Sequence, residues 1–181
     1  MKFWKKFLLG LLALILVFLI IGFFLPSHCR VEKNLVMNTS PEAVFARVDT
    51  LKRWPEWTAW TTNRFPDMKI KFEGPESGVG AMMIAKGKSS GNGMVKITRA
   101  EAEKGVWYDL DFEHGRQICQ GAIIYVRTET GLKATWSLET DMGANPVKRW
   151  AGLFLNKLMG GDMARGLANL KKQVESSNEG Q

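Results

Sequence analysis

The sequence predicts an α+β domain, in which a curved antiparallel sheet wraps around a long C-terminal helix, preceded by one transmembrane helix. Three observations support this prediction. An uninterrupted apolar run opens the chain, alternating segments separated by turn residues fill its middle, and a helical pattern closes it. This order is typical of an α+β fold, because a final helix can cover the one apolar face of an antiparallel sheet.

The apolar run extends from Phe7 to Leu25, over 19 residues without a charged or hydrogen-bonding side chain. As a helix it rises ~28 Å, which is close to the hydrocarbon thickness of a bilayer. A cleaved secretory signal is the alternative, but such signals have a shorter apolar region and a small-x-small cleavage site. Here the run is followed by the sequence PSHC. We therefore expect residues 1–29 to be an uncleaved transmembrane anchor with its linker.

Charged residues around the run predict its orientation. Lys2, Lys5 and Lys6 precede it, whereas charges of both signs follow it between His28 and Lys33. The positive-inside rule then places the N-terminus in the cytoplasm and the domain on the extracytoplasmic side. The expected location is a bacterial-type inner membrane, with a single-pass topology and the lipid bilayer as a partner.

Alternation and turn residues predict the elements of one domain over residues 30–177. A first strand at 30–37 is followed by a helix that begins at the cap Ser40 and Pro41, and by a short helix or turn at 52–60. The helix predicted at 145–176 is expected to break at Gly160-Gly161, where its apolar stripe changes side. Residues 178–181 are expected to be a flexible tail. The other predicted strands are 69–73, 79–86, 94–99, 106–113, 118–128 and 132–141.

Charge and motif content exclude several classes of function. The net charge is +7, but the basic residues beyond the anchor are scattered rather than gathered in a stripe, which argues against a nucleic-acid partner. His28 and His114 have no Cys, Asp or Glu at the spacing of metal ligands. No catalytic residue, metal or cofactor is predicted. Cys29 and Cys119 are expected to be unpaired thiols, with a disulfide between them as the alternative.

Several short segments carry a resemblance to a known superfamily. In this order and spacing they resemble the SRPBCC superfamily, which includes START-like, polyketide-cyclase and pollen-allergen-like domains with the helix-grip fold. The resemblance covers Arg30 to Glu175. The segments are SPEAVF at 40–45, the cluster Trp54, Pro55, Trp57 and Trp60, GVGA at 78–81, YDLDF at 108–112, KATWS at 133–137 and GLANLK at 166–171.

The resemblance implies an apolar cavity between the sheet and the C-terminal helix that holds a hydrophobic small molecule or a lipid. Many relatives have a Trp at the position of Ala85, so the cavity is expected to be roomier here. A polyketide cyclase/dehydrase-like enzyme and an interaction module with a filled core are the alternatives. The candidates for the cavity lining are Trp60, Met83, Ala85, Val95, Ile97, Tyr108, Leu110, Phe112, Ile123, Trp136, Leu138 and Phe154.

The segment from Val147 to Met159 contains more apolar residues than one helix face can bury, together with Lys148, Arg149 and Lys157. One hypothesis is that it lies near the bilayer and forms an apolar port between membrane and cavity. The alternative is an ordinary buried helix.

Overall fold

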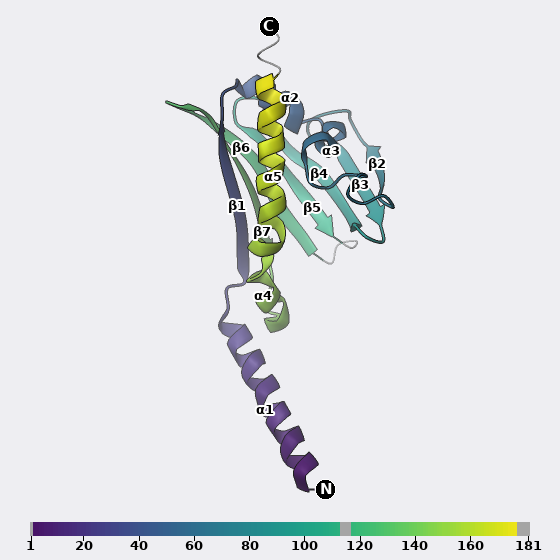
Figure 1. Ribbon diagram of the computed structural model, residues 1–181, viewed down its shortest axis with the longest axis vertical. Coiled ribbons are helices and arrows are strands. Elements are labelled where there is room, and N and C mark those ends of the chain that lie inside the picture. The colour runs from purple at the N-terminus through teal and green to yellow at the C-terminus, as the bar shows by residue number, and fades with distance from the viewer. Residues whose placement is uncertain (1, 113–116, 177–181) are drawn as a thin grey trace.

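The computed structural model of the protein describes residues 2–112 and 117–176. One face of a seven-stranded antiparallel sheet is covered by a long C-terminal helix, and an N-terminal helix projects away from one end of the domain (Figure 1). This arrangement confirms the predicted α+β helix-grip fold. The predicted tail 178–181 and the turn at His114 lie outside the described residues.

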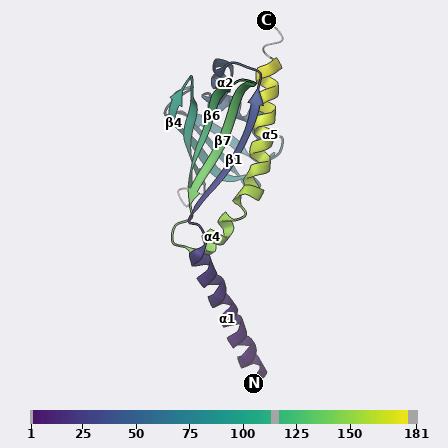
Figure 2. The ribbon, with the colours of Figure 1, turned by 90° about the vertical axis from the view of Figure 1, so that its left-hand side faces the viewer.

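The strands form a meander in which consecutive strands from β2 to β7 pair in order, and β1 pairs with β7. The sheet curves so that its concave face holds the C-terminal helix (Figure 2). Every predicted strand is present, with its ends shifted by a few residues. The strands are β1 (His28–Met37), β2 (Lys69–Glu73), β3 (Met82–Gly87), β4 (Gly91–Glu101), β5 (Gly105–Phe112), β6 (Gln117–Thr128) and β7 (Gly131–Asp141).

Short helices carry the chain from β1 to the opposite edge of the sheet at β2. They are α2 (Pro41–Val48), a 3₁₀ turn η1 (Leu51–Arg53) and α3 (Trp54–Trp57). The start of α2 is as predicted: Ser40 Oγ accepts a hydrogen bond from the Ala43 amide, and Pro41 occupies the first turn. Two helices, α4 (Pro146–Gly152) and α5 (Leu155–Ser176), close the chain.

The break in the C-terminal helix lies at residues 153–154, and the prediction of a break at Gly160-Gly161 was wrong. Gly160 and Gly161 are inside α5, where Gly160 lets the helix approach β1 closely: a Cβ there would lie 2.8 Å from Cε of Lys33. The apolar stripe changes side for another reason. The first part of the stripe, from Val147 to Leu158, does not face the sheet, because the side chains at its two ends are 55% and 69% exposed.

Alanine at the two glycines of α5 should have different effects on stability. We expect Gly161→Ala to raise the free energy of unfolding by ~0.5–1 kcal/mol, because glycine is a poor helix former, and a Cβ at 161 meets nothing within 4 Å. Gly160→Ala should gain less, because its Cβ would lie 2.6 Å from Asn156 Oδ1 as well as against Lys33. Urea unfolding of both variants in detergent micelles measures this difference. Equal gains would show that the Asn156 and Lys33 side chains move aside for the new Cβ.

The N-terminal helix α1 (Lys2–Phe24) is, among the described residues, the one helix long and apolar enough to cross a membrane, over Phe3–Phe24. A signal sequence near the N-terminus can also meet these criteria of length and hydropathy. The C-terminal end of α1 contacts α4. The ring of Phe18 stacks on Trp150 with centroids 4.9 Å apart, and the Trp150 indole N–H donates to the Phe18 carbonyl at 3.0 Å. Arg149 donates to the carbonyls of Phe23 and Leu25, at 2.6 and 3.2 Å.

The hydrophobic core lies between the concave face of the sheet and the helices α2, α3 and α5. At the end far from α1 it is densely filled, and Val44, Leu132 and Leu170 there are at most 2% exposed. Toward the end from which α1 departs, the filling is incomplete. The unfilled part is the cavity described next.

Candidate functional site

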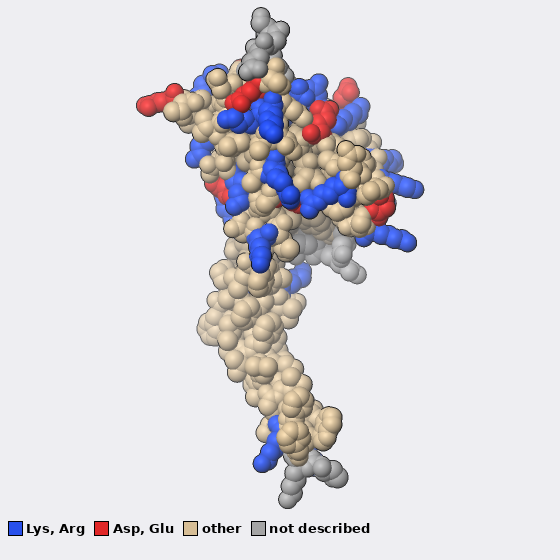
Figure 3. All heavy atoms as spheres, viewed as in Figure 1, with Lys and Arg blue, Asp and Glu red and all other residues tan. Residues whose placement is uncertain are grey.

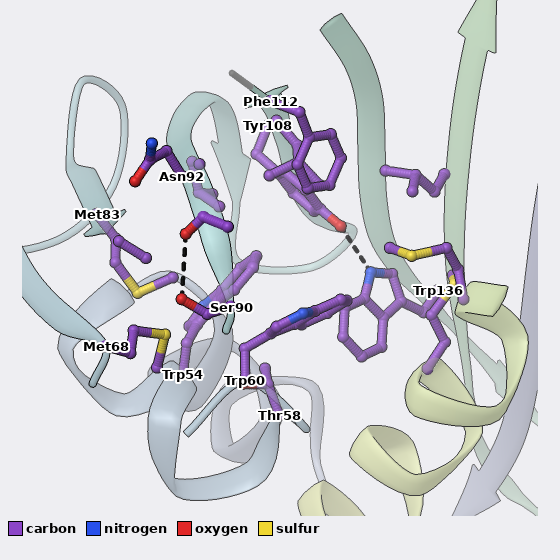
Figure 4. Close-up of a pocket in the computed structure, with 18 residues that line it drawn as sticks. Trp54, Thr58, Trp60, Met68, Met83, Ser90, Asn92, Tyr108, Phe112 and Trp136 are labelled. Atoms are coloured by element: carbon purple, nitrogen blue, oxygen red, sulfur yellow. Dashed lines mark hydrogen bonds between the residues drawn. The ribbon is translucent and has the colours of Figure 1, made fainter. Parts of the chain in front are cut away.

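A cavity of about 80 Å³ lies between the sheet and the first half of α5 (Figure 4). Strands β3, β4, β5 and β7 form its floor, and α3, α5 and the loop at 58–68 form its cover. The residues that line it are Trp54, Thr58, Trp60, Met68, Met83, Ala85, Ser90, Gly91, Asn92, Gly93, Val95, Tyr108, Leu110, Phe112, Trp136, Leu138, Met159 and Met163.

The floor of the cavity follows from strand register. Ala85 in β3 is opposite Gly93 in β4, and Gly93 is opposite Phe112 in β5. Because side chains alternate across a strand, the residues two positions further along, such as Val95 and Leu110, face the same side. Gly93 contributes no side chain, so the space above it belongs to the cavity.

Nine of the predicted residues line this cavity: Trp60, Met83, Ala85, Val95, Tyr108, Leu110, Phe112, Trp136 and Leu138. Ile97 and Ile123 are completely buried, but they lie further along their strands in the filled part of the core. Phe154 lies in the break between α4 and α5, where its side chain is 57% exposed and away from the cavity. The role of the nine as ligand contacts stays a prediction.

Other lining residues were missed. Met159 and Met163 face the cavity from one side of α5, four residues apart, and helical periodicity could have identified them. Thr58, Met68 and Ser90 come from loops, which have no periodic pattern to mark the face they present. Only the packing of these loops against α5 and the sheet brings them to the site.

Tyr108 and Trp136 form a buried polar pair in the cavity wall. The indole N–H of Trp136 donates to the Tyr108 hydroxyl at 2.7 Å, shown as a dashed line in Figure 4. The Tyr108 ring also meets Trp54 edge-on, with centroids 5.0 Å apart, and lies directly over Gly121. Since the hydroxyl oxygen accepts from Trp136, its own proton is available to a ligand that carries a hydrogen-bond acceptor.

Burial raises the pKa of the Tyr108 phenol well above its usual range, and the Trp136 hydrogen bond offsets only part of this shift. Burial also raises the pKa of Tyr125, whose hydroxyl donates to the Ala102 carbonyl. These are the two tyrosines of the chain. In the unfolded chain both ionise near a pH of about 10, whereas the folded protein resists their ionisation.

Alkaline pH should therefore unfold the protein in step with tyrosine ionisation. A raised folded-state pKa means that stability is retained below a pH of about 10 and is lost as the pH rises beyond it, where the unfolded state releases protons. We expect tyrosinate absorbance to appear together with the loss of near-ultraviolet circular dichroism. Tyr108→Phe should make the alkaline decrease in stability shallower. Half of the full tyrosinate absorbance at pH ~10 with an intact fold would contradict burial of both phenols.

Two polar contacts hold the loops around the cavity. Arg64 pairs with the buried carboxylate of Asp162 on α5, with Nη1 and Oδ2 2.9 Å apart, which ties the loop at 58–68 to the helix. The Asp67 carboxylate accepts from the backbone amides of Lys88 and Ser89, at 2.6 and 3.0 Å, and so joins the same loop to the turn before β4. Hydrogen bonds from Ser89 lower the pKa of Asp67 and keep it ionised. The loop at 58–68, which covers the cavity, is thus attached both to α5 and to the turn before β4.

The lining suits the binding of an apolar molecule. Among the described lining residues there is no carboxylate, imidazole, thiol or amine, and Tyr108 is the one titratable group. Within residues 2–112 and 117–176, no group of three or more His, Cys, Asp and Glu side chains gathers as a metal site would require. The lining can therefore make apolar contacts and a few hydrogen bonds with a bound molecule.

Cys29 and Cys119 lie on β1 and β6, each opposite Thr140 of the intervening strand β7. Two strand spacings amount to ~9.5 Å, which exceeds the Cα separation of about 7 Å that a disulfide can span. Both cysteines are free thiols, as predicted.

The fold and the apolar cavity under the C-terminal helix define a helix-grip domain of the SRPBCC superfamily, as the resemblance implied. Residues 28–175 match the family described as "Polyketide cyclase / dehydrase and lipid transport", and the chain belongs to this family. No curated protein matches the chain in sequence.

Solved structures share the fold. The di-domain ARO/CYC protein StfQ from the steffimycin biosynthetic pathway is 10% identical, with a TM-score of 0.64 over 84% of this chain and 52% of that one. The chain thus spans about half the length of StfQ. A norcoclaurine synthase point mutant from Thalictrum is 13% identical, with a TM-score of 0.60 over 83% and 96% of the two chains. The KanY protein is 19% identical, with a TM-score of 0.58 over 83% and 99%. These likenesses concern the fold alone.

Proposed function

We propose that this protein is a membrane-anchored binding domain that holds an apolar small molecule, or the apolar part of a lipid, in the cavity under α5. The observation that carries the proposal is the cavity itself: an unfilled, mostly apolar space in a core that is otherwise densely packed. Membership in a family described by cyclisation, dehydration and lipid transport supports a hydrophobic ligand.

The size of the cavity limits the ligand. Its volume of about 80 Å³ is well below the ~300–1,000 Å³ typical of pockets for drug-sized molecules. A larger ligand must displace side chains, and the lining favours this, because methionine is unbranched and has several rotatable bonds. The lining methionines are Met68, Met83, Met159 and Met163.

The small volume also favours a second candidate function, that of an interaction module. In such a module the space is an incompletely packed part of the core rather than a ligand site. An enzyme of the cyclase/dehydrase type has less support. Such chemistry needs titratable groups that converge on the substrate, and the described lining offers Tyr108 alone, with a pKa that burial moves away from neutrality.

Retention of α1 as a membrane anchor is part of the proposal. Two contacts of α1 with α4 support retention: Phe18 stacks on Trp150, and Arg149 donates hydrogen bonds to the end of α1. A signal that is cleaved off would not stay in contact with the mature domain. The lysines before the span favour a cytoplasmic N-terminus and an extracytoplasmic domain. Mass spectrometry of the intact protein from membranes should give a mass that includes the α1 segment. A mass that lacks the α1 segment would contradict the anchor.

Mass spectrometry of organic extracts tests the ligand. The full-length protein, purified in mild detergent, should carry an apolar compound that is depleted when Ala85→Trp fills the cavity. Lipids that adhere to α1 serve as an internal control, because they accompany both proteins equally. Identical extracts would contradict the binding function and favour the interaction module.

A further inference from the structure

We propose that α4 and the first turn of α5 form a second membrane contact, lying in the interface of the same bilayer that α1 spans. The occupant of this surface is the lipid itself, with acyl chains against its apolar side chains and anionic headgroups against its basic ones. This inference rests on the proposed anchoring by α1 and adds the position that the domain takes at the membrane.

Exposed apolar side chains are concentrated in this segment. Among the described residues outside α1, half of the large apolar side chains that are exposed fall between residues 147 and 158. The others are scattered over the loop before β3 and the strands β2 and β6. The concentrated set is Val147, Leu153, Phe154 and Leu158, at 55%, 51%, 57% and 69% exposure.

The contact with α1 sets the depth of this surface. Trp150 stacks on Phe18, which lies six positions before the end of α1 at Phe24. At 1.5 Å per residue this places Trp150 ~9 Å inside the end of the span. Helices that lie in a membrane interface bury their apolar face to a depth of ~5–10 Å, and indole rings are enriched there. The surface is therefore continuous with the span and lies at interfacial depth.

The charges of the segment complement an anionic membrane surface. Lys148, Arg149 and Lys157 lie between residues 142 and 161, a stretch that contains no acidic residue. Arg149 also donates to the last carbonyls of α1, which would otherwise lack partners where the span leaves the hydrocarbon. In Figure 3 the surface from α1 onto the base of the domain is almost entirely uncharged, and the charged side chains gather above it.

This contact turns the cavity toward the lipid. β1 begins at His28, directly after α1, and the antiparallel register brings the end of β5 at Phe112 and the start of β4 at Gly91 to the same end of the sheet. Phe112, Gly91 and Gly93 all line the cavity. An apolar ligand could then pass between bilayer and cavity without crossing bulk water.

Spin-label accessibility tests the inference on the full-length protein in vesicles of phosphatidylethanolamine and phosphatidylglycerol. In a Cys29→Ser background, nitroxides are attached at Leu153→Cys or Leu158→Cys, at Val126→Cys as the aqueous control, and at Ile15→Cys within the span. Val126 is a matched control, because it is 62% exposed but lies toward the opposite end of the sheet. Collisions with oxygen report lipid, and collisions with a nickel chelate report water.

Labels at 153 and 158 should lose collisions with nickel relative to the label at 126 and gain collisions with oxygen. If they collide with nickel as often as the label at 126, while the label at 15 is in lipid, the second contact is overturned and the anchor stands. If the label at 15 is also in water, both are overturned. Ligand binding in the cavity is tested separately by the extracts, so its failure is distinguishable from either result.

Discussion

Ala85→Trp is expected to weaken ligand binding strongly while the fold remains intact. Ala85 faces the cavity from β3, opposite Gly93, which has no side chain to obstruct a larger neighbour. An indole at this position would occupy the space of about 80 Å³ that a ligand must use. Because binding relies on apolar contact in this one space, we expect the affinity to fall by roughly tenfold or more.

A titration with the apolar fluorescent probe N-phenyl-1-naphthylamine measures this loss. Lys86→Trp is the matched control, since the adjacent residue carries the same new side chain on the opposite, exposed face of β3. Probe that partitions into the detergent or binds α1 contributes equally to both variants. Equal affinity of the two variants would show that the probe, and by extension the ligand, binds elsewhere.

Gly121→Ala is expected to have the largest effect on stability. A Cβ at this position would lie 2.1 Å from Cζ of Tyr108, and the ring cannot easily move aside. Trp54 packs against the ring, and the Trp136 hydrogen bond holds its hydroxyl. Overpacking costs ~1–3 kcal/mol, and a buried indole N–H without its acceptor costs a further ~1–3 kcal/mol. We expect the free energy of unfolding to fall by about 2–6 kcal/mol.

Urea unfolding in detergent compares this variant with Gly93→Ala. Gly93 is also a strand glycine beside the cavity, but its Cβ would meet nothing nearer than 3.6 Å, so little change is expected. The cost of Gly121→Ala should shrink in a Tyr108→Leu background, because the colliding ring is gone. Equal, small effects at both glycines would contradict the position of the Tyr108 ring.

Local patterns predicted the elements well, because their causes are local. The cap at Ser40 and Pro41 starts α2 as expected, and turn residues separate the strands of the meander. The break in the C-terminal helix was misplaced because its cause is tertiary. Gly160 serves contact with Lys33 of β1, a residue more than a hundred positions away, and no local rule distinguishes that use of glycine from a helix break.

The sequence predicted which face of the sheet carries the candidate site, but not which part of that face borders the cavity. Alternation places Val95 and Ile97 on the same face of β4, yet Val95 lines the cavity and Ile97 is in the filled core. The difference depends on how far α3 and α5 reach along the sheet. Phe154 was predicted to line the cavity, but the break at 153–154 turns it outward.

The sequence by itself determined the apolar N-terminal helix, the α+β class, the order of the strands and the apolar face of the sheet, because each depends on the type and spacing of neighbouring residues. Only the tertiary structure decided where the C-terminal helix breaks, which part of the core stays unfilled and how small that space is. These depend on the fit between segments distant in the chain. The contact of α4 with α1 is of the same kind: hydropathy marks both segments as apolar, but only their packing brings Trp150 to Phe18.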